Sequence, residues 1–171
     1  MDRLDGTIGA GGSSWIRKVV VAADGSPASL QGLERAADLA VRLGAKVVVV
    51  FVRHFPATAL MANPVTEPNL MAALDEQESE VRQAVLRLVG STGVAWEFVV
   101  RLGSPGEEIV KVAEEKSVDL IVIGSDRHSS LHNLLLGSTA AYVTTHSPCP
   151  VLVVRSAAQN KRAALMEVIR S

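Results

Sequence analysis

From residue 17 onward, the chain alternates short uninterrupted apolar runs with segments whose apolar residues recur every three or four positions. Runs rich in β-branched residues and apolar at successive positions are typical of strands covered on both faces of a parallel sheet. The segments with helical spacing supply the crossovers that parallel strands require. We therefore predict an α/β fold built from βαβ units. The five predicted strands are residues 17–24, 46–52, 95–102, 118–124 and 150–155.

Four helices are predicted between these strands. The first begins at Ser26-Pro27, because a hydroxyl residue followed by proline suits a helix start, and it ends at Gly44, because glycine suits the residue after the last turn. The others are predicted from residue 70 to a stop at Gly90, from Ser104-Pro105 onward, and from Gly137 to a stop before Pro148.

Composition limits the classes of function. The 171 residues are 48% hydrophobic with a formal net charge of −1, which indicates one globular domain and no nucleic-acid partner. No apolar run reaches the ~20 residues that span a bilayer, so no membrane partner is expected. The single cysteine, Cys149, suits a reducing compartment, and we predict a cytoplasmic location. The predicted organisation is a flexible N-terminal tail over 1–15, one domain over 17–155, and a C-terminal extension with weak helical periodicity over 156–171.

A ligand site is expected between the first and fourth strands, since open parallel sheets with the strand order 3-2-1-4-5 bind ligands at the carboxyl ends of those strands. Asp24 ends the first strand, and Gly124 ends the fourth and would let the chain turn sharply and approach a ligand closely. Gly137-Ser138-Thr139 opens a helix, where free N–H groups attract anions. Gly137 and Ser138 could equally serve only to break and cap a helix; their place at the switch point favours phosphate binding.

Two stretches resemble the universal stress protein family, namely VVVAADGS after residue 18 and GSDRHSSLHNLLLGSTAAYVTTHSPCPVLVV from residue 124, and the similarity covers residues 17–155. The resemblance implies an open five-stranded parallel sheet of order 3-2-1-4-5 with helices on both faces, the adenine nucleotide alpha hydrolase-like fold. The nucleotide-binding branch of that family carries G-x2-G-x9-G-[S/T]. Gly124 matches its first glycine and Gly137-Ser138 its last pair, but Arg127 replaces the second glycine.

The same resemblance implies a ligand and partners. The ligand would be ATP or a related adenine nucleotide, with or without Mg²⁺. Asp24 would meet the adenine and ribose end, Val52 would line the adenine pocket, and the backbone of Ser138 and Thr139 would hold phosphate. A homodimer would form through the last strand, near Val151 to Val154, and an unknown protein partner would take part in a stress response or signalling role.

Arg127 leaves three interpretations open. Its guanidinium can pair with phosphate, it can strain or fill the loop where the family has glycine, or it can be a solvated surface residue. Replacing Arg127 with glycine separates them, because the change weakens ATP binding in the first case, strengthens it in the second and leaves it unchanged in the third.

No catalytic set is evident, and we do not expect an enzyme beyond slow ATP hydrolysis. The segment GSDRHSS lacks the G-x-S-x-G elbow of hydrolases, and His128 and His132 lack the further ligands of a metal site. Two functions stay open. One is a nucleotide-binding stress or signalling module, and the other is a stress-protein homodimer that binds no nucleotide and works through protein contacts.

Overall fold

The computed structural model describes residues 15–54, 67–125 and 136–155. Most of the predicted N-terminal tail and all of the predicted C-terminal extension lie outside these residues, so what was predicted for them stays a prediction. The described helices include none that is long and apolar enough to cross a membrane.

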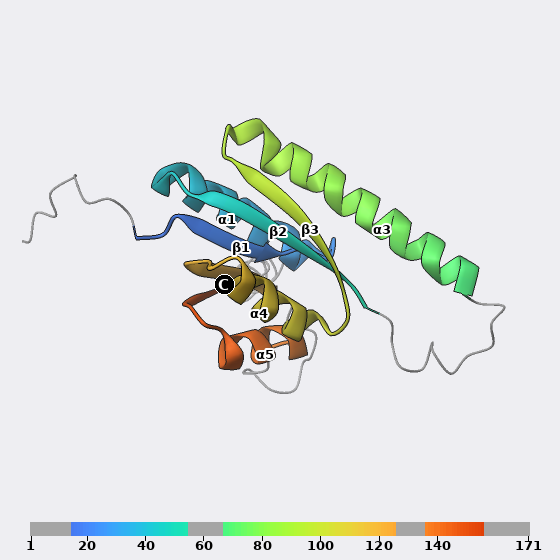
Figure 1. Ribbon diagram of the computed structural model, residues 1–171. Coiled ribbons are helices and arrows are strands. Elements are labelled where there is room, and N and C mark those ends of the chain that lie inside the picture. Colours follow the sequence, from blue (N-terminus) through green and yellow to red (C-terminus); the bar gives the residue numbers. More distant parts are fainter. Residues whose placement is uncertain (1–14, 55–66, 126–135, 156–171) are drawn as a thin grey trace, which may run out of the picture.

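The five strands form one parallel sheet of order β3-β2-β1-β4-β5, as predicted (Figure 1). β1 lies at the centre, where Val20 pairs with Val48 on one side and Ile121 on the other. The strand order therefore reverses between β1 and β4, and β3 and β5 are the two edges. The strands are β1 (Lys18–Ala22), β2 (Lys46–Arg53), β3 (Trp96–Leu102), β4 (Leu120–Ser125) and β5 (Val151–Arg155).

Helices cover both faces of the sheet, because successive strand residues point to opposite sides. Val21 packs with Leu33 of α1 and Val81 of α3 on one face. Val20 packs with Ile109 and Val143, from α4 and α5, on the other. Figure 1 shows these two layers on either side of the sheet. The helices are α1 (Pro27–Leu43), α3 (Glu67–Leu88), α4 (Pro105–Glu115) and α5 (Ser138–His146).

The predicted helix ends are confirmed for α1. Ser26 caps it by accepting a hydrogen bond from the Ser29 N–H at 3.2 Å, and Gly44 ends it with φ +65°.

The end of α3 differs from the prediction. The helix stops at Leu88, a 3-10 turn spans Gly90–Thr92, and Gly93 rather than Gly90 has the left-handed conformation, with φ +75°. The tighter turn is closed by the Thr92 N–H on the Val89 carbonyl and keeps Val89 fully buried. Packing of this one side chain thus moves the left-handed glycine three residues along the chain.

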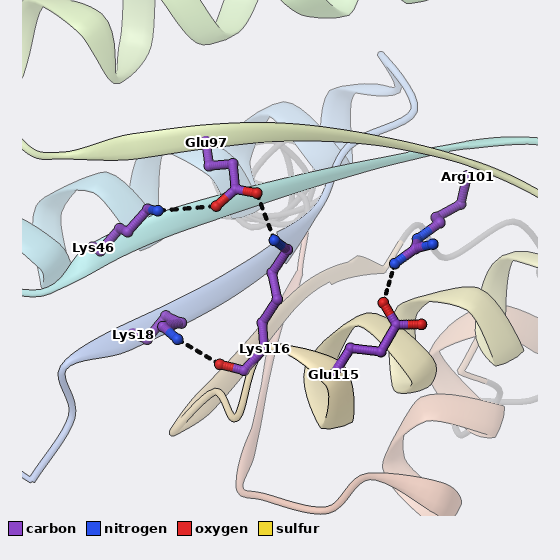
Figure 2. Close-up of polar contacts among 6 residues, drawn as sticks. All are labelled: Lys18, Lys46, Glu97, Arg101, Glu115 and Lys116. Carbon is purple, nitrogen blue, oxygen red and sulfur yellow. Dashed lines mark hydrogen bonds and ion pairs between the residues drawn. The ribbon is translucent and has the colours of Figure 1, made fainter.

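A charged network joins three strands to the C-terminal end of α4 (Figure 2). The Glu97 carboxylate of β3 accepts from Lys116 Nζ at 2.5 Å and from Lys46 Nζ at 2.9 Å. Lys18 Nζ donates to the Lys116 carbonyl at 2.5 Å, which places a cation at the negative end of the helix. The network therefore ties α4 to β1, β2 and β3 at the end of the sheet where these strands begin.

Glu97 is expected to make stability depend on pH. The hydrogen bonds from Lys116 and Lys46 lower its pKa from 4.5 to about 2. A carboxyl whose pKa is depressed on folding stabilises the fold above its unfolded pKa, and this contribution is lost as the pH falls through the folded pKa. We expect Glu97→Gln to lose about 1 kcal/mol of unfolding free energy at pH 7, since solvent screens a side chain that is 36% exposed. Urea titrations should show the full loss at pH 7 and a much smaller one at pH 2, where about half of the Glu97 carboxyls are protonated, and an equal loss at both would contradict this origin.

Candidate functional site

A cavity of about 300 Å³ lies at the carboxyl ends of β1 and β4, where the strand order reverses. Its inner wall is apolar and comes from β2, β4 and α4. Its rim carries Asp24, two residues after β1, and the first residues of α5. The site is thus at the place that the strand order predicts. The apolar wall includes Val50, Val52, Ile109 and Ile123.

Six of the seven site residues predicted from the sequence line this cavity. The seventh, Arg127, lies outside the described residues, so its three interpretations stay open. The structure brings together residues that are up to 115 positions apart in the chain, and their contacts with a ligand remain predictions. The six are Asp24, Val52, Gly124, Gly137, Ser138 and Thr139.

Asp24 is held in place by hydrogen bonds with three residues. Its N–H donates to Ser29 Oγ at 3.3 Å, its Oδ1 accepts from the Ser26 N–H at 2.9 Å, and its carbonyl accepts from Gln77 Nε2 at 2.8 Å. Gly25 makes the turn that follows, with φ +85°. Burial by itself raises the pKa of Asp24, but the hydrogen bonds from Ser26 and Ser29 bring it below its ordinary value. The site therefore presents a carboxylate at neutral pH.

The N-terminus of α5 forms another part of the rim. The first N–H groups of an α-helix have no acceptor within the helix, so those of Ser138 and Thr139 are available to an anion. Gly137 precedes them with φ −55°, and a Cβ built on it would meet no atom within 4 Å. Neither backbone conformation nor packing against the described residues requires glycine here.

Gly124 does not make the predicted sharp turn, and its predicted close approach to a ligand stays a prediction. It does not adopt the left-handed conformation of a sharp turn and instead lies within β4. A Cβ at this position would lie 2.3 Å from the carbonyl carbon and oxygen of Ala28 and 2.6 Å from the Ser29 nitrogen. Gly32 adds to the same contact, because its own Cβ would lie 3.3 Å from the Gly124 nitrogen. Glycine at 124 therefore lets the start of α1 pack directly against β4.

Sequence reasoning missed several residues of the site. Ile109 and Ile123 carry only the ordinary signal of buried positions in a helix and a strand, and Pro105 carries only the signal of a helix start. Gln77 lies on the exposed side of a helix, and nothing local distinguishes it. The signal that could have found the isoleucines is their position at the carboxyl side of the sheet.

The universal stress protein family model matches residues 16–155. The chain belongs to the universal stress protein family. It is 34% identical over 145 residues to the universal stress protein MJ0531 of Methanocaldococcus jannaschii, a match that covers 84% of this chain and 85% of that one. This confirms the family resemblance read from the two motif stretches.

Solved universal stress proteins have the same fold. The UspA protein of Lactobacillus plantarum superposes with a TM-score of 0.70 at 26% identity, over 83% of this chain and 99% of that one. A universal stress protein solved in complex with cAMP superposes with a TM-score of 0.63 at 26% identity, over 84% of this chain and 99% of that one. The adenine nucleotide alpha hydrolase-like fold predicted for this chain is confirmed.

Proposed function

We propose that this universal stress protein domain binds ATP or a related adenine nucleotide in the cavity and acts in stress response or signalling. The observation that carries the proposal is the pairing, in one cavity, of an apolar wall with a helix N-terminus whose leading glycine is required neither by its backbone conformation nor by contact with the described residues. An adenine ring needs the first feature and a phosphate needs the second.

The two ends of the nucleotide fit two ends of the site. Val50, Val52 and Ile123 supply the apolar wall for the base, and the Asp24 carboxylate is placed to accept hydrogen bonds from ribose or adenine. The backbone N–H groups of Ser138 and Thr139 donate hydrogen bonds to the phosphate. The relative solved with cAMP supports this assignment, because its ligand is an adenine nucleotide.

Any Mg²⁺ at the site would be bound largely by the phosphates of the nucleotide. Asp24 is the only carboxylate among the described residues that line the cavity. The described part of the chain also holds no group of three or more His, Cys, Asp or Glu side chains that could bind a metal. We therefore propose that any Mg²⁺ arrives with the nucleotide, as magnesium bound through substrate phosphates commonly does.

Direct binding tests the function. Purified protein is titrated with ATP, ADP, AMP and cyclic AMP by calorimetry, with Mg²⁺ and with a chelator. At a hundred times its dissociation constant, a ligand that binds only the folded state adds about 2.7 kcal/mol of stability. For a chain of this size that is a rise in Tm of roughly 5 to 11 °C. If no nucleotide gives heat or a thermal shift at millimolar concentration, the proposal is wrong and the module that works through protein contacts alone takes its place.

We further propose that the site binds without substantial turnover. Among the described lining residues there is no histidine, lysine or cysteine to act as base or nucleophile. Slow hydrolysis of ATP is compatible with positioning and charge alone. Phosphate release at about 1 per second or faster would contradict this part of the proposal.

A homodimer through β5 is the proposed assembly. β5 is an edge strand, and edge strands present unpaired N–H and C=O groups that another copy can bind. Beside it lies a hollow of about 390 Å³ between β5 and α1. Its lining combines apolar side chains with charges of both signs, which suits a self-complementary contact. The lining residues are Arg35, Asp38, Leu39, Arg42, Leu152 and Val154.

Leu152→Ala is expected to weaken this dimer. Leu152 is 38% exposed in the single chain, and each dimer would bury two copies of it, so we expect a dissociation constant about tenfold higher. Leu102→Ala is the matched control, because Leu102 is 63% exposed on the opposite edge strand, β3. Light scattering and sedimentation measure the dimer dissociation constants of both variants and of the parent. A parent protein that is monomeric at micromolar concentration, or equal effects of the two variants, would contradict the β5 interface.

A further inference from the structure

We propose that Gln77 of α3 is a positioning residue that orients Asp24 at the adenosine end of the site. The inference rests on the proposed nucleotide binding and goes one step further, since it assigns a ligand-dependent role to a helix outside the cavity lining. Gln77 itself does not line the cavity.

The hydrogen bond from Gln77 ties the Asp24 turn to α3. The other two partners of Asp24 are Ser26 and Ser29, which belong to the same turn and to the first turn of α1. They hold the turn to the start of α1, which packs against β4. Gln77 Nε2 reaches the Asp24 carbonyl at 2.8 Å from 53 residues away. It therefore fixes how the turn lies relative to α3.

α3 is itself firmly attached at this level of the sheet. The Glu78 carboxylate, whose side chain is only 13% exposed, accepts from Arg53 Nε at 2.9 Å and Nη2 at 2.5 Å. Asp75 adds a second ion pair to the same guanidinium at 2.8 Å. Arg53 directly follows Val52, which lines the cavity. Neighbouring residues of α3 thus hold the end of β2 by an ion pair and the turn after β1 by the Gln77 amide.

The turn also touches the helix sterically. A Cβ on Gly25 would lie 3.4 Å from Val81 Cγ2, one helical turn beyond Gln77. The Asp24 turn is therefore seated against α3, with Val81 behind Gly25 and Gln77 on the Asp24 carbonyl. Without the amide donor, the Asp24 peptide can rotate, and its carboxylate would spend less time in the orientation that the nucleotide needs.

The phosphate end should not depend on Gln77, because it is built from α5. Loss of the Gln77 donor should therefore weaken the binding of AMP and the binding of adenosine by the same factor. A general loosening of the fold would instead act on every contact of the ligand. This difference separates positioning from stability.

The test compares Gln77→Met with Glu76→Met. Methionine is close to glutamine in length and has no donor, and Glu76 is an exposed neighbour with no hydrogen bond or ion pair among the described residues. We expect three- to tenfold weaker binding of AMP to Gln77→Met, the range for one lost hydrogen bond, and a change below twofold for Glu76→Met. Gln77→Glu, which cannot donate at neutral pH, should weaken AMP binding at least as much. Unchanged AMP affinity in both Gln77 variants would overturn the inference.

A double-mutant cycle shows whether Gln77 acts through Asp24. In an Asp24→Ala background there is no carboxylate to orient, so Gln77→Met should have no further effect on AMP affinity. An equal loss in both backgrounds would overturn the positioning role. The inference and the proposed function fail differently: a parent that binds no adenine nucleotide overturns both, whereas a parent that binds AMP no better than Gln77→Met overturns only the role of Gln77.

Discussion

Replacing Gly124 with alanine is expected to destabilise the fold by about 3 kcal/mol, at the upper end of the usual cost of overpacking. The added Cβ would lie 2.3 Å from the backbone carbonyl of Ala28, and backbone atoms cannot swing aside as a side chain can. α1 would have to move away from β4. For a chain of this size the loss corresponds to a fall in Tm of roughly 6 to 12 °C, measurable by calorimetry or circular dichroism.

Gly137→Ala is the matched control for Gly124→Ala. Both glycines belong to the same motif, but a Cβ on Gly137 would contact none of the described residues within 4 Å, and its backbone conformation suits any residue. Its Tm should fall by only about 2 to 4 °C, since Ala in place of Gly at an N-cap costs up to about 1 kcal/mol. Equal thermal stability of the Gly124 and Gly137 variants would show that the close contact between α1 and β4 does not explain Gly124.

The second large effect is expected on ligand binding. Gly137→Val should weaken adenine nucleotide binding by about a hundredfold, or about 2.7 kcal/mol. The branched side chain would occupy the space beside the N-terminus of α5, through which phosphate approaches the N–H groups of Ser138 and Thr139. Calorimetry with ATP and AMP measures the loss.

Thermal unfolding of the same variant provides the control, because Gly137→Val should fold normally. Gly137→Ala, with a smaller side chain, should give an intermediate loss of affinity. Parent-like binding by Gly137→Val would show that phosphate does not approach this backbone, and it would leave Gly137 as a simple helix start.

Much of the fold could be predicted from the sequence because its causes are local. Five apolar β-branched runs, such as Val19 to Val21, require cover on both faces, and the helical segments between them allow only parallel crossovers. The same holds for α1, whose start at Ser26 and end at Gly44 depend on capping and on backbone conformation. Strand order then placed the site between β1 and β4.

Other features were decided only by tertiary packing. The reason for glycine at 124 is the carbonyl of Ala28, 96 positions earlier, and a local pattern cannot report how closely a helix approaches a strand. The left-handed glycine after α3 is Gly93 because the buried Val89 determines how the chain leaves that helix.

The polar partners follow the same rule. Glu97 meets Lys116 and Lys46 only because two strands and a helix end come together, and Gln77 reaches Asp24 only because α3 lies beside the turn after β1. The sequence by itself determined which segments are strands and helices, since the burial period and capping act within each segment, and the expected strand order then placed the cavity. The tertiary structure decided which side chains meet, since those distances depend on how separate elements pack.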